Sequence, residues 1–140
     1  MSDPRFAIQI ALVTRIAELA AELNGRVYDD VPPFDSRVAD TGAGFPYVSL
    51  GDGQISPIDE ECFERTTNFF YVNVWSRAVG FPESARIAGV IRVGLHEKDL
   101  VIEGHVLDGL RVESVNYLRD PDGLTRRARL ELAVDTQPAS

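Results

Sequence analysis

Side chains with catalytic or metal-binding chemistry are few in this sequence, and their spacing suits neither task. His96 and His105 match no metal-ligand motif such as HExxH. The consecutive acids Asp59, Glu60 and Glu61 would point in different directions, and no EF-hand spacing surrounds them. We therefore interpret the histidines as a helix-terminal residue and an exposed turn residue, and the acids as part of a solvated loop.

The remaining candidates for acid–base or nucleophilic chemistry are aspartates and a single cysteine. General acid–base catalysis needs carboxylates in a cleft with separated pKa values. Instead, Asp29, Asp30, Asp120 and Asp122 lie in stretches typical of turns. The lone Cys62 excludes an internal disulfide and is interpreted as a small buried hydrophobe. No GxSxG, Walker or GxGxxG motif is present. We therefore expect no enzyme activity, no cofactor and no metal site.

Length and charge narrow the class of protein further. The 140 residues suit one domain, which we place at residues 1–136 with a frayed C-terminal tail at 137–140. The net charge of −8 argues against a broad nucleic-acid-binding face, because phosphate neutralisation needs clustered Lys and Arg. Charged residues interrupt the apolar stretch at 6–23, so it predicts neither a signal peptide nor a membrane span. We expect a protein that is made and kept in a cytosol-like compartment.

The first part of the chain predicts one helix followed by mostly irregular structure. Apolar side chains recur along one helical face, at Ile8, Leu12, Ile16, Leu19 and Leu23. Asn24-Gly25 supplies a helix stop. Two adjacent prolines and several aspartates at 26–44 predict a long surface loop. Residues 47–50 predict a short strand, and the proline and acids at 54–61 predict an exposed connector rather than a central strand.

The middle of the chain predicts a long strand and a second helix. The strand covers about residues 64–77, and the helix begins with Pro82 and ends near Lys98. Short apolar pieces on either side of Glu103-Gly104 predict a tight hairpin.

The last third predicts two strands, at about 110–118 and 125–136, joined by the hairpin sequence RDPDG. The final strand alternates between apolar and charged residues. The resulting order α–β–β–α–β–β–β predicts an α+β domain, in which an antiparallel sheet packs against two helices. Each helix has one apolar stripe, so each can cover one sheet face only.

The strand segment NFFYVNVWSRA at 68–78 is apolar on both sides. A strand of a sheet with one face in water would instead alternate apolar and polar residues. One side carries Phe70, Val72 and Val74, and the other carries the large aromatics Phe69, Tyr71 and Trp75. Two interpretations are open. One helix covers each face, so that both faces are core, or a partner covers the aromatic face. In the second case the stretches 26–44 and 51–62 become candidate docking elements.

Several stretches together resemble a known family. They are GRVYDDVP at 25–32, FPYVSLGD at 45–52, VNVWSRAVG at 72–80, PESARIAGVIRVGL at 82–95 and RDPDGLTRRARLEL at 119–132. In this order they resemble the tail-completion, or tail-terminator, proteins of long-tailed phages and of phage-derived gene transfer agents. The resemblance extends from the first helix to the last strand, and VWSR and RDPDG are its most distinctive parts.

The resemblance implies a structural virion protein without cofactor or catalytic residue. Members of this family form a ring, usually a hexamer, at the head-proximal end of the tail. The resemblance implies that such a ring caps the tail tube, contacts the tube protein and the head-completion (stopper) protein, and lets DNA pass without sequence-specific binding. The expected location is the virion tail, after synthesis in the bacterial cytoplasm.

A ring interface joins two different patches of identical subunits. The candidate interface residues are Tyr28, Pro33, Phe34, Phe69, Tyr71, Trp75, Arg77, Glu60 and Glu61. Two alternatives stay open at this point. The chain could be another connector of the same particle, such as a head-completion stopper or a minor tail protein. It could also be a small-molecule-binding α+β domain, which would need a pocket with convergent polar groups and a perturbed titratable residue.

Overall fold

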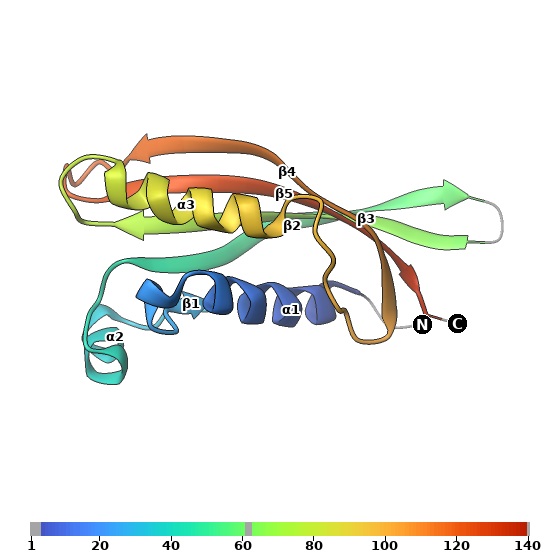
Figure 1. The fold of residues 1–140 in the computed structure, drawn as a ribbon, viewed down its shortest axis with the longest axis horizontal. Helices are drawn as coiled ribbons and strands as arrows, with labels where there is room; N and C mark the ends of the chain where they lie inside the picture. The colour runs from blue at the N-terminus through green and yellow to red at the C-terminus, as the bar shows by residue number, and fades with distance from the viewer. Residues whose placement is uncertain (1–3, 61–62, 140) are drawn as a thin grey trace.

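The computed structural model describes residues 4–60 and 63–139, which form a sheet and three α-helices (Figure 1). The elements are α1 Pro4–Leu19, the short 3-10 helix η1 Ala21–Leu23, β1 Val27–Tyr28, α2 Phe34–Thr41, β2 Tyr47–Glu60, β3 Phe63–Ser76, α3 Pro82–Leu95, β4 His105–Arg119 and β5 Arg126–Pro138. The strands form a five-stranded sheet in the order β1-β2-β3-β5-β4. The predicted α+β class is confirmed, with the correction that β1 pairs in parallel with β2 and makes the sheet mixed.

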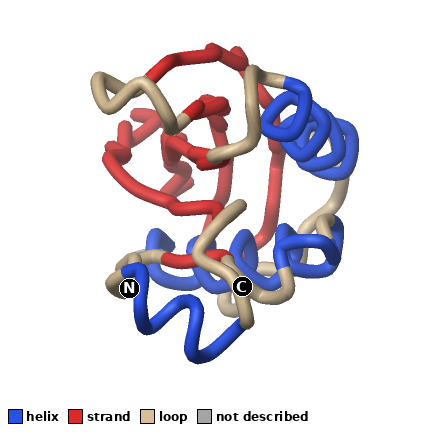
Figure 2. Tube along the Cα trace, turned by 90° about the vertical axis from the view of Figure 1, so that its left-hand side faces the viewer, coloured by secondary structure: helices blue, strands red, loops and turns tan. Residues whose placement is uncertain are grey.

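Both long helices cover the same face of the sheet. The buried residues of α1 and α3 form one cluster with the even-numbered residues Phe70, Val72 and Val74 of β3. Viewed roughly along the strands, the sheet is curved and the helices lie to its right and below it (Figure 2). α1 and α3 also contact each other, since a Cβ at Gly94 would lie 2.5 Å from Leu19 Cδ1. The interpretation with one helix on each face is therefore wrong, because the two stripes share one core.

The two predicted helices are confirmed, with small changes at their ends. The first ends at Leu19 and continues as η1, before Asn24 at φ 47° and Gly25 at φ 81° stop it in the left-handed region. The second begins at Pro82 and ends at Leu95, slightly earlier than Lys98. None of the helices in the described parts of the chain is long and apolar enough to cross a membrane.

The stretch 26–44 is not the long loop that its prolines and aspartates predict, because it contains β1 and α2. The sequence pattern does not predict α2, because this helix has no apolar stripe. Its apolar residues Phe34 and Val38 are exposed, and the one buried residue of the helix is Arg37. Such a short polar helix is marginal alone and depends on tertiary contacts.

The stretch 54–61 is also different from its prediction. Residues 54–60 continue β2, which pairs with β3 up to Glu60↔Phe63, and residue 61 lies outside the described residues. Pro57 is compatible with a strand here because β1 pairs only with Val48 and Ser49, so β2 has a free edge on that side. The predicted exposed connector is therefore an edge strand.

The C-terminal hairpin is confirmed. β4 and β5 pair from His105↔Pro138 to Arg119↔Arg126, which makes both strands longer than predicted and places Gln137 and Pro138 inside β5. The hydrogen bonds from Thr125, through its backbone N–H and its hydroxyl, and from the Leu124 N–H lower the pKa of Asp122 to about 2. Asp122 is therefore a turn former, as its context predicts.

The hairpin predicted around Glu103-Gly104 exists only as a turn. Gly104 adopts φ 76°, and a single bridge joins Ile102 to His105. His105 already begins the long strand β4, so no short second strand forms there.

Candidate functional site

The face of the sheet opposite α1 and α3, here called the second face, carries the aromatic residues of β3 that the sequence pattern marks as unusual. Phe69, Tyr71 and Trp75 on β3 lie opposite Ala133, Glu131 and Arg127 of β5. Cross-strand partners lie on the same face of a sheet. Tyr47 of β2 pairs with Trp75 and therefore lies on the second face. Tyr28 of β1 pairs with Ser49 of β2, two residues after Tyr47, and lies on the same face. The aromatic side chains of β3 on this face are half-buried, unlike Phe70, which is 1% exposed.

Three strands, the segment before β2 and the helix α2 contribute rings to one continuous aromatic cluster on this face. Tyr47 is central: its ring centroid lies 5.2 Å from Phe45, 6.0 Å from Trp75 in a stacked arrangement and 6.3 Å from Tyr28. Phe34 of α2 extends the cluster, 6.3 Å from Phe45. The Trp75 indole N–H donates to Ser49 Oγ at 2.9 Å, which satisfies its polar end.

Arg37 holds α2 against this cluster. Its Nε donates to the Gly44 carbonyl at 2.9 Å, and its Nη1 donates to the Pro32 carbonyl at 2.7 Å. The guanidinium carbon lies 4.3 Å from the centroid of the Tyr47 ring, a cation–π distance. Burial raises the pKa of the Tyr47 phenol even though the positive charge of Arg37 opposes this shift. The cluster is therefore a partly desolvated, ordered surface.

We expect Arg37→Ala to loosen α2 and the aromatic cluster without unfolding the sheet. The change removes two hydrogen bonds from a charged donor together with the stack on Tyr47, which together correspond to about 2–4 kcal/mol of local stability. Hydrogen exchange should become faster in α2, and near-UV circular dichroism should lose the Tyr47–Trp75 signal. Arg92→Ala, at an exposed arginine of α3, is the matched control. Unchanged exchange in α2 would contradict this role of Arg37.

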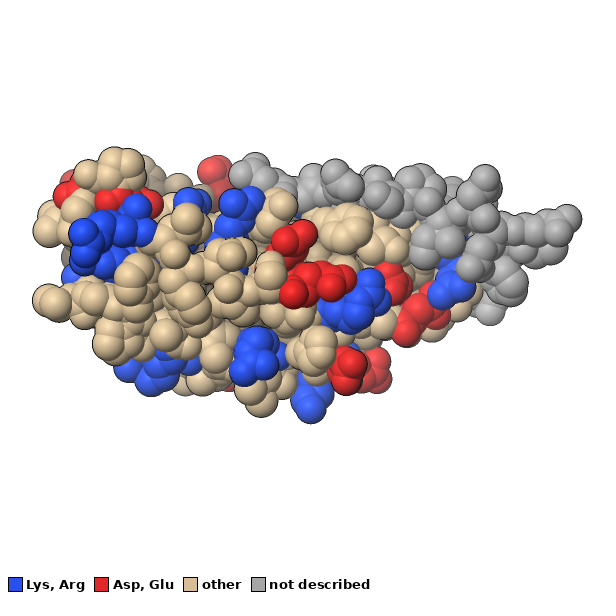
Figure 3. Space-filling view, turned by 90° about the horizontal axis from the view of Figure 1, so that it is seen from above, with Lys and Arg blue, Asp and Glu red and all other residues tan. Residues whose placement is uncertain are grey.

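Three arginines border the cluster. The guanidinium carbons of Arg129, Arg77 and Arg127 lie 3.7 Å from the Tyr71 centroid, 4.6 Å from Phe45 and 5.0 Å from Trp75. From above, basic side chains gather at the end of the molecule where β4 ends and β5 begins, next to some acidic ones (Figure 3). Aromatic residues and arginine are the types enriched in protein–protein contacts.

The structure brings together only part of the predicted site. Tyr28, Phe34, Trp75 and Arg77 meet through Phe45 and Tyr47, which the sequence prediction missed. Tyr71 continues the second face beside Arg129.

The other predicted residues take different places. Phe69 lies on the second face, where it has no ring contact among the described residues. Pro33 precedes α2 and its carbonyl accepts the Arg37 N–H. Glu60 is the last residue of β2, far along the sheet, and Glu61 lies outside the described residues, as does Cys62.

The sequence prediction also did not include three further residues of the site, Arg37, Arg127 and Arg129. The alternation of β5 did place Arg127 and Arg129 on one face of their strand. It could not show which rings lie beside them, because the register between β3 and β5 is a tertiary property.

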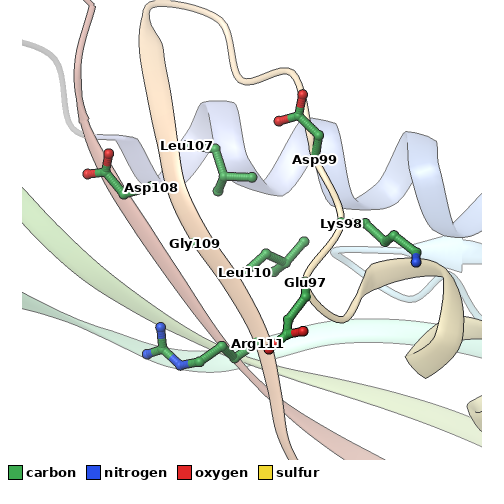
Figure 4. Close-up of a pocket in the computed structure, with 8 residues that line it drawn as sticks. All are labelled: Glu97, Lys98, Asp99, Leu107, Asp108, Gly109, Leu110 and Arg111. Carbon is green, nitrogen blue, oxygen red and sulfur yellow. The ribbon is translucent and has the colours of Figure 1, made fainter.

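The structure gives little support to a small-molecule site. A groove of about 420 Å³ lies between β4 and the segment after α3. Its charged groups do not converge: Asp108 and Arg111 point to the opposite side of β4 from Lys98 and Asp99 (Figure 4). Arg111 is instead paired with Asp135 at 2.7 Å, which raises the pKa of its guanidinium.

The histidines have structural roles. The backbone N–H of Val112 donates to His96 Nδ1 at 2.9 Å, at the end of α3, and His105 Nδ1 lies 3.0 Å from the Glu103 carbonyl oxygen in the turn. Among the described residues, no group of histidine, cysteine and acidic side chains is arranged to hold a metal ion. The second face therefore remains as the candidate site, and its chemistry is that of a contact surface.

Comparisons with known proteins find one family model and similar solved structures. The family model described as "Tail completion protein gp17" matches residues 10–136. A chain of the structure titled "Virion of native gene transfer agent (GTA) particle" is similar over 98% of this chain and 99% of that chain, with 25% identity and a TM-score of 0.83. The structure of bacteriophage SPP1 gp17 protein is 19% identical, with 91% and 89% of the two chains covered and a TM-score of 0.48. No curated protein sequence matches.

Proposed function

Because the chain belongs to the tail completion protein gp17 family, we propose that it is a tail terminator, a structural protein of the virion of a phage or gene transfer agent. In this role it forms a ring, hexameric by the family resemblance, that caps the tail tube at its head-proximal end and helps to join tail and head. The observation that carries the proposal is the end-to-end similarity, at a TM-score of 0.83, to a chain of a gene transfer agent virion.

The second face supplies a physical reason for assembly. Both long helices cover the other face, and in the described parts of the chain only the short α2 contacts this cluster, which leaves much of its aromatic and arginine surface half-buried. Such anchors are typical of the residues that dominate binding energy in interfaces. In a ring, this patch would meet a different patch of the neighbouring subunit, and rotation would close the circle.

The proposed partners follow from this position in the particle. They are the tail tube protein on one side of the ring and the head-completion protein on the other, with DNA passing through the centre. The net charge of −8 is compatible with a passage that does not grip DNA, since few phosphate contacts give weak binding. The proposal requires neither cofactor nor catalysis.

The proposal is tested by particle morphology together with native mass. Purified protein should form a ring whose mass is a small multiple of 15.4 kDa in light scattering or native mass spectrometry. Particles that lack the chain should have tails of uncontrolled length that do not join heads in electron micrographs. Tails of normal length that still fail to join heads would instead favour another connector, such as a stopper. Normal tails joined to heads would overturn the proposal.

A further inference from the structure

We propose that Arg127 and Arg129 form the basic half of the subunit contact, and that α2 of a second copy of this chain, with Asp35 and Asp40, forms the acidic half. This inference rests on the proposed ring and names the contact between neighbouring subunits. It is supported by the charge, the exposure and the position of the two halves in the fold.

Arg127 and Arg129 have no acidic partner in the described parts of the chain, and none of their guanidinium N–H groups donates a hydrogen bond there. Arg111 on the neighbouring strand, by contrast, pairs with Asp135 at 2.7 Å. Each guanidinium group offers five donors in a fixed geometry that suits a carboxylate. The two arginines therefore keep this binding capacity for a group from outside the subunit.

Aromatic stacking holds both guanidinium groups in place. The guanidinium carbon of Arg127 lies 5.0 Å from the Trp75 centroid, and that of Arg129 lies 3.7 Å from the Tyr71 centroid. Because the side chains are already ordered, little entropy remains to be lost when a carboxylate arrives. Their alternation along β5 places the two Cα atoms about 7 Å apart on the second face.

A groove of about 340 Å³ opens beside Arg129 on the second face. Asn116 and Arg129 both line it, and each can donate hydrogen bonds to a carboxylate that enters. Glu131 lines it as well, and its carboxylate would repel a run of closely spaced phosphates. The groove therefore fits a protein segment that presents single carboxylates better than it fits nucleic acid.

The region of α2 has the opposite charge. The four acids of residues 29–40 are all exposed and have no basic partner in the described parts of the chain. The one cation of this stretch, Arg37, is buried and donates to backbone carbonyls. No positive charge therefore offsets the carboxylates at the surface. The four acids are Asp29, Asp30, Asp35 and Asp40.

α2 also exposes apolar side chains next to these acids. Phe34 is 49% exposed and Val38 is 38% exposed, one turn apart on the helix. A surface that combines carboxylates with exposed apolar groups complements one that combines arginines with aromatic rings. The second face and α2 are therefore complementary in both charge and polarity.

The two halves lie at the same end of the molecule but towards opposite borders of the sheet (Figure 1). α2 lies between β1 and β2 in the chain, whereas Arg127 and Arg129 begin β5, next to the border strand β4. Within one chain β2 and β3 separate the two halves. If subunits stand side by side with their strands along the ring axis, the halves meet at one height. A contact without a rise along the axis closes a ring, whereas a contact with a rise builds an open helix.

The contact is tested by reversing the charges on each side separately and then together. The face variant is Arg127→Glu with Arg129→Glu, and the helix variant is Asp35→Lys with Asp40→Lys. Native mass is measured by light scattering over a dilution series, with circular dichroism as the check of folding. We expect each variant to associate about 100-fold or more weakly than the wild-type chain, because like charges then face each other.

Combining the changes should restore assembly. The fourfold variant again places opposite charges across each contact. In an equimolar mixture of the two double variants, copies can alternate around a hexamer, so that every contact also joins opposite charges. Recovery in the mixture shows that the contact joins two copies rather than two parts of one chain.

Matched controls separate charge from folding. Arg92→Glu on α3 and Glu18→Lys on α1 reverse exposed charges elsewhere and should leave assembly unchanged. Arg127→Gln with Arg129→Gln replaces the face variant if the glutamates prevent folding. Asp35→Asn with Asp40→Asn replaces the helix variant if the lysines loosen α2. Both neutral pairs should still weaken assembly, by about 10-fold or more.

The outcomes distinguish this contact from the ring itself. A wild-type chain that stays monomeric, even with the tail tube protein, overturns both proposals. A wild-type ring that survives either reversal overturns only the contact. The contact is also overturned if the fourfold variant or the mixture fails to recover assembly. A face variant that assembles normally but loses affinity for DNA assigns the arginines to phosphates, and likewise overturns the contact.

Discussion

Replacing Trp75 with alanine is expected to abolish ring assembly and to leave a folded monomer. Trp75 lies half-buried on the second face near the end of β3, stacked on Tyr47 and bordered by Arg127. Tryptophan anchors of this kind cost about 2 kcal/mol or more per contact when truncated, which weakens each subunit contact about 30-fold or more. Every contact of a closed ring carries the same loss, so assembly should fail at concentrations that support the wild-type ring.

The fold should survive this change. A fully buried tryptophan costs about 3–5 kcal/mol when replaced by alanine. Trp75 is only half-buried and also loses its hydrogen bond to Ser49, so we expect about 2–3 kcal/mol. That leaves a folded chain if the domain has an ordinary stability of about 5–15 kcal/mol.

Light scattering and far-UV circular dichroism on the same samples check both halves of this prediction. Tyr117→Ala is the matched control, because Tyr117 is an aromatic residue at 49% exposure that lies opposite Ala128 on the helix-bearing side and packs on Phe81. It should leave assembly intact. A Trp75→Ala chain that assembles like the wild type would contradict the role of the second face.

Replacing Phe70 with alanine should do the opposite and destabilise the monomer itself. Phe70 is one of the largest fully buried side chains, at 1% exposure, in the cluster that α1 and α3 share with the sheet. Its ring also lies 4.1 Å from the guanidinium carbon of Arg5 on α1. Loss of this ring leaves a cavity where three elements meet, so we expect the free energy of unfolding to fall by about 3–5 kcal/mol.

Urea and thermal unfolding followed by circular dichroism measure this loss, with a fall in Tm of about 10–20 °C. The adjacent Phe69→Ala is the matched control, since it removes the same side chain from the half-buried second face of the same strand. It should cost roughly half as much or less. Equal losses for Phe69 and Phe70 would show that both faces of β3 are core.

The elements that sequence reasoning predicted well are those encoded by neighbouring residues. The apolar period of residues 8–23, the proline start at 82 and the RDPDG turn each act over a few positions, and α1, α3 and the β4–β5 hairpin follow them. α2 and the far part of β2 were missed for the converse reason. Arg37 stabilises α2 through contacts that local periodicity does not contain, and Pro57 is tolerated only because β1 is so short.

The candidate site was predicted in its residue types more than in its arrangement. The sequence marks Phe69, Tyr71 and Trp75 as unusual, because large aromatic residues on the second side of a strand need a partner to cover them, and it includes Arg77 among the candidate interface residues. It does not mark Tyr47 and Arg37, which organise the cluster, because each is ordinary in its own segment.

By itself the sequence determined the fold class, the two long helices, the C-terminal hairpin, the absence of recognisable catalytic motifs and the resemblance to tail completion proteins. These features depend on interactions or patterns within short stretches, which a single chain displays directly. Only the tertiary structure decided that both helices share one face and that Tyr28, Tyr47, Trp75 and the arginines gather on the other. The physical reason is that strand register and helix placement arise from contacts between segments far apart in the chain, and a strand with two apolar faces does not specify which of them the helices will cover.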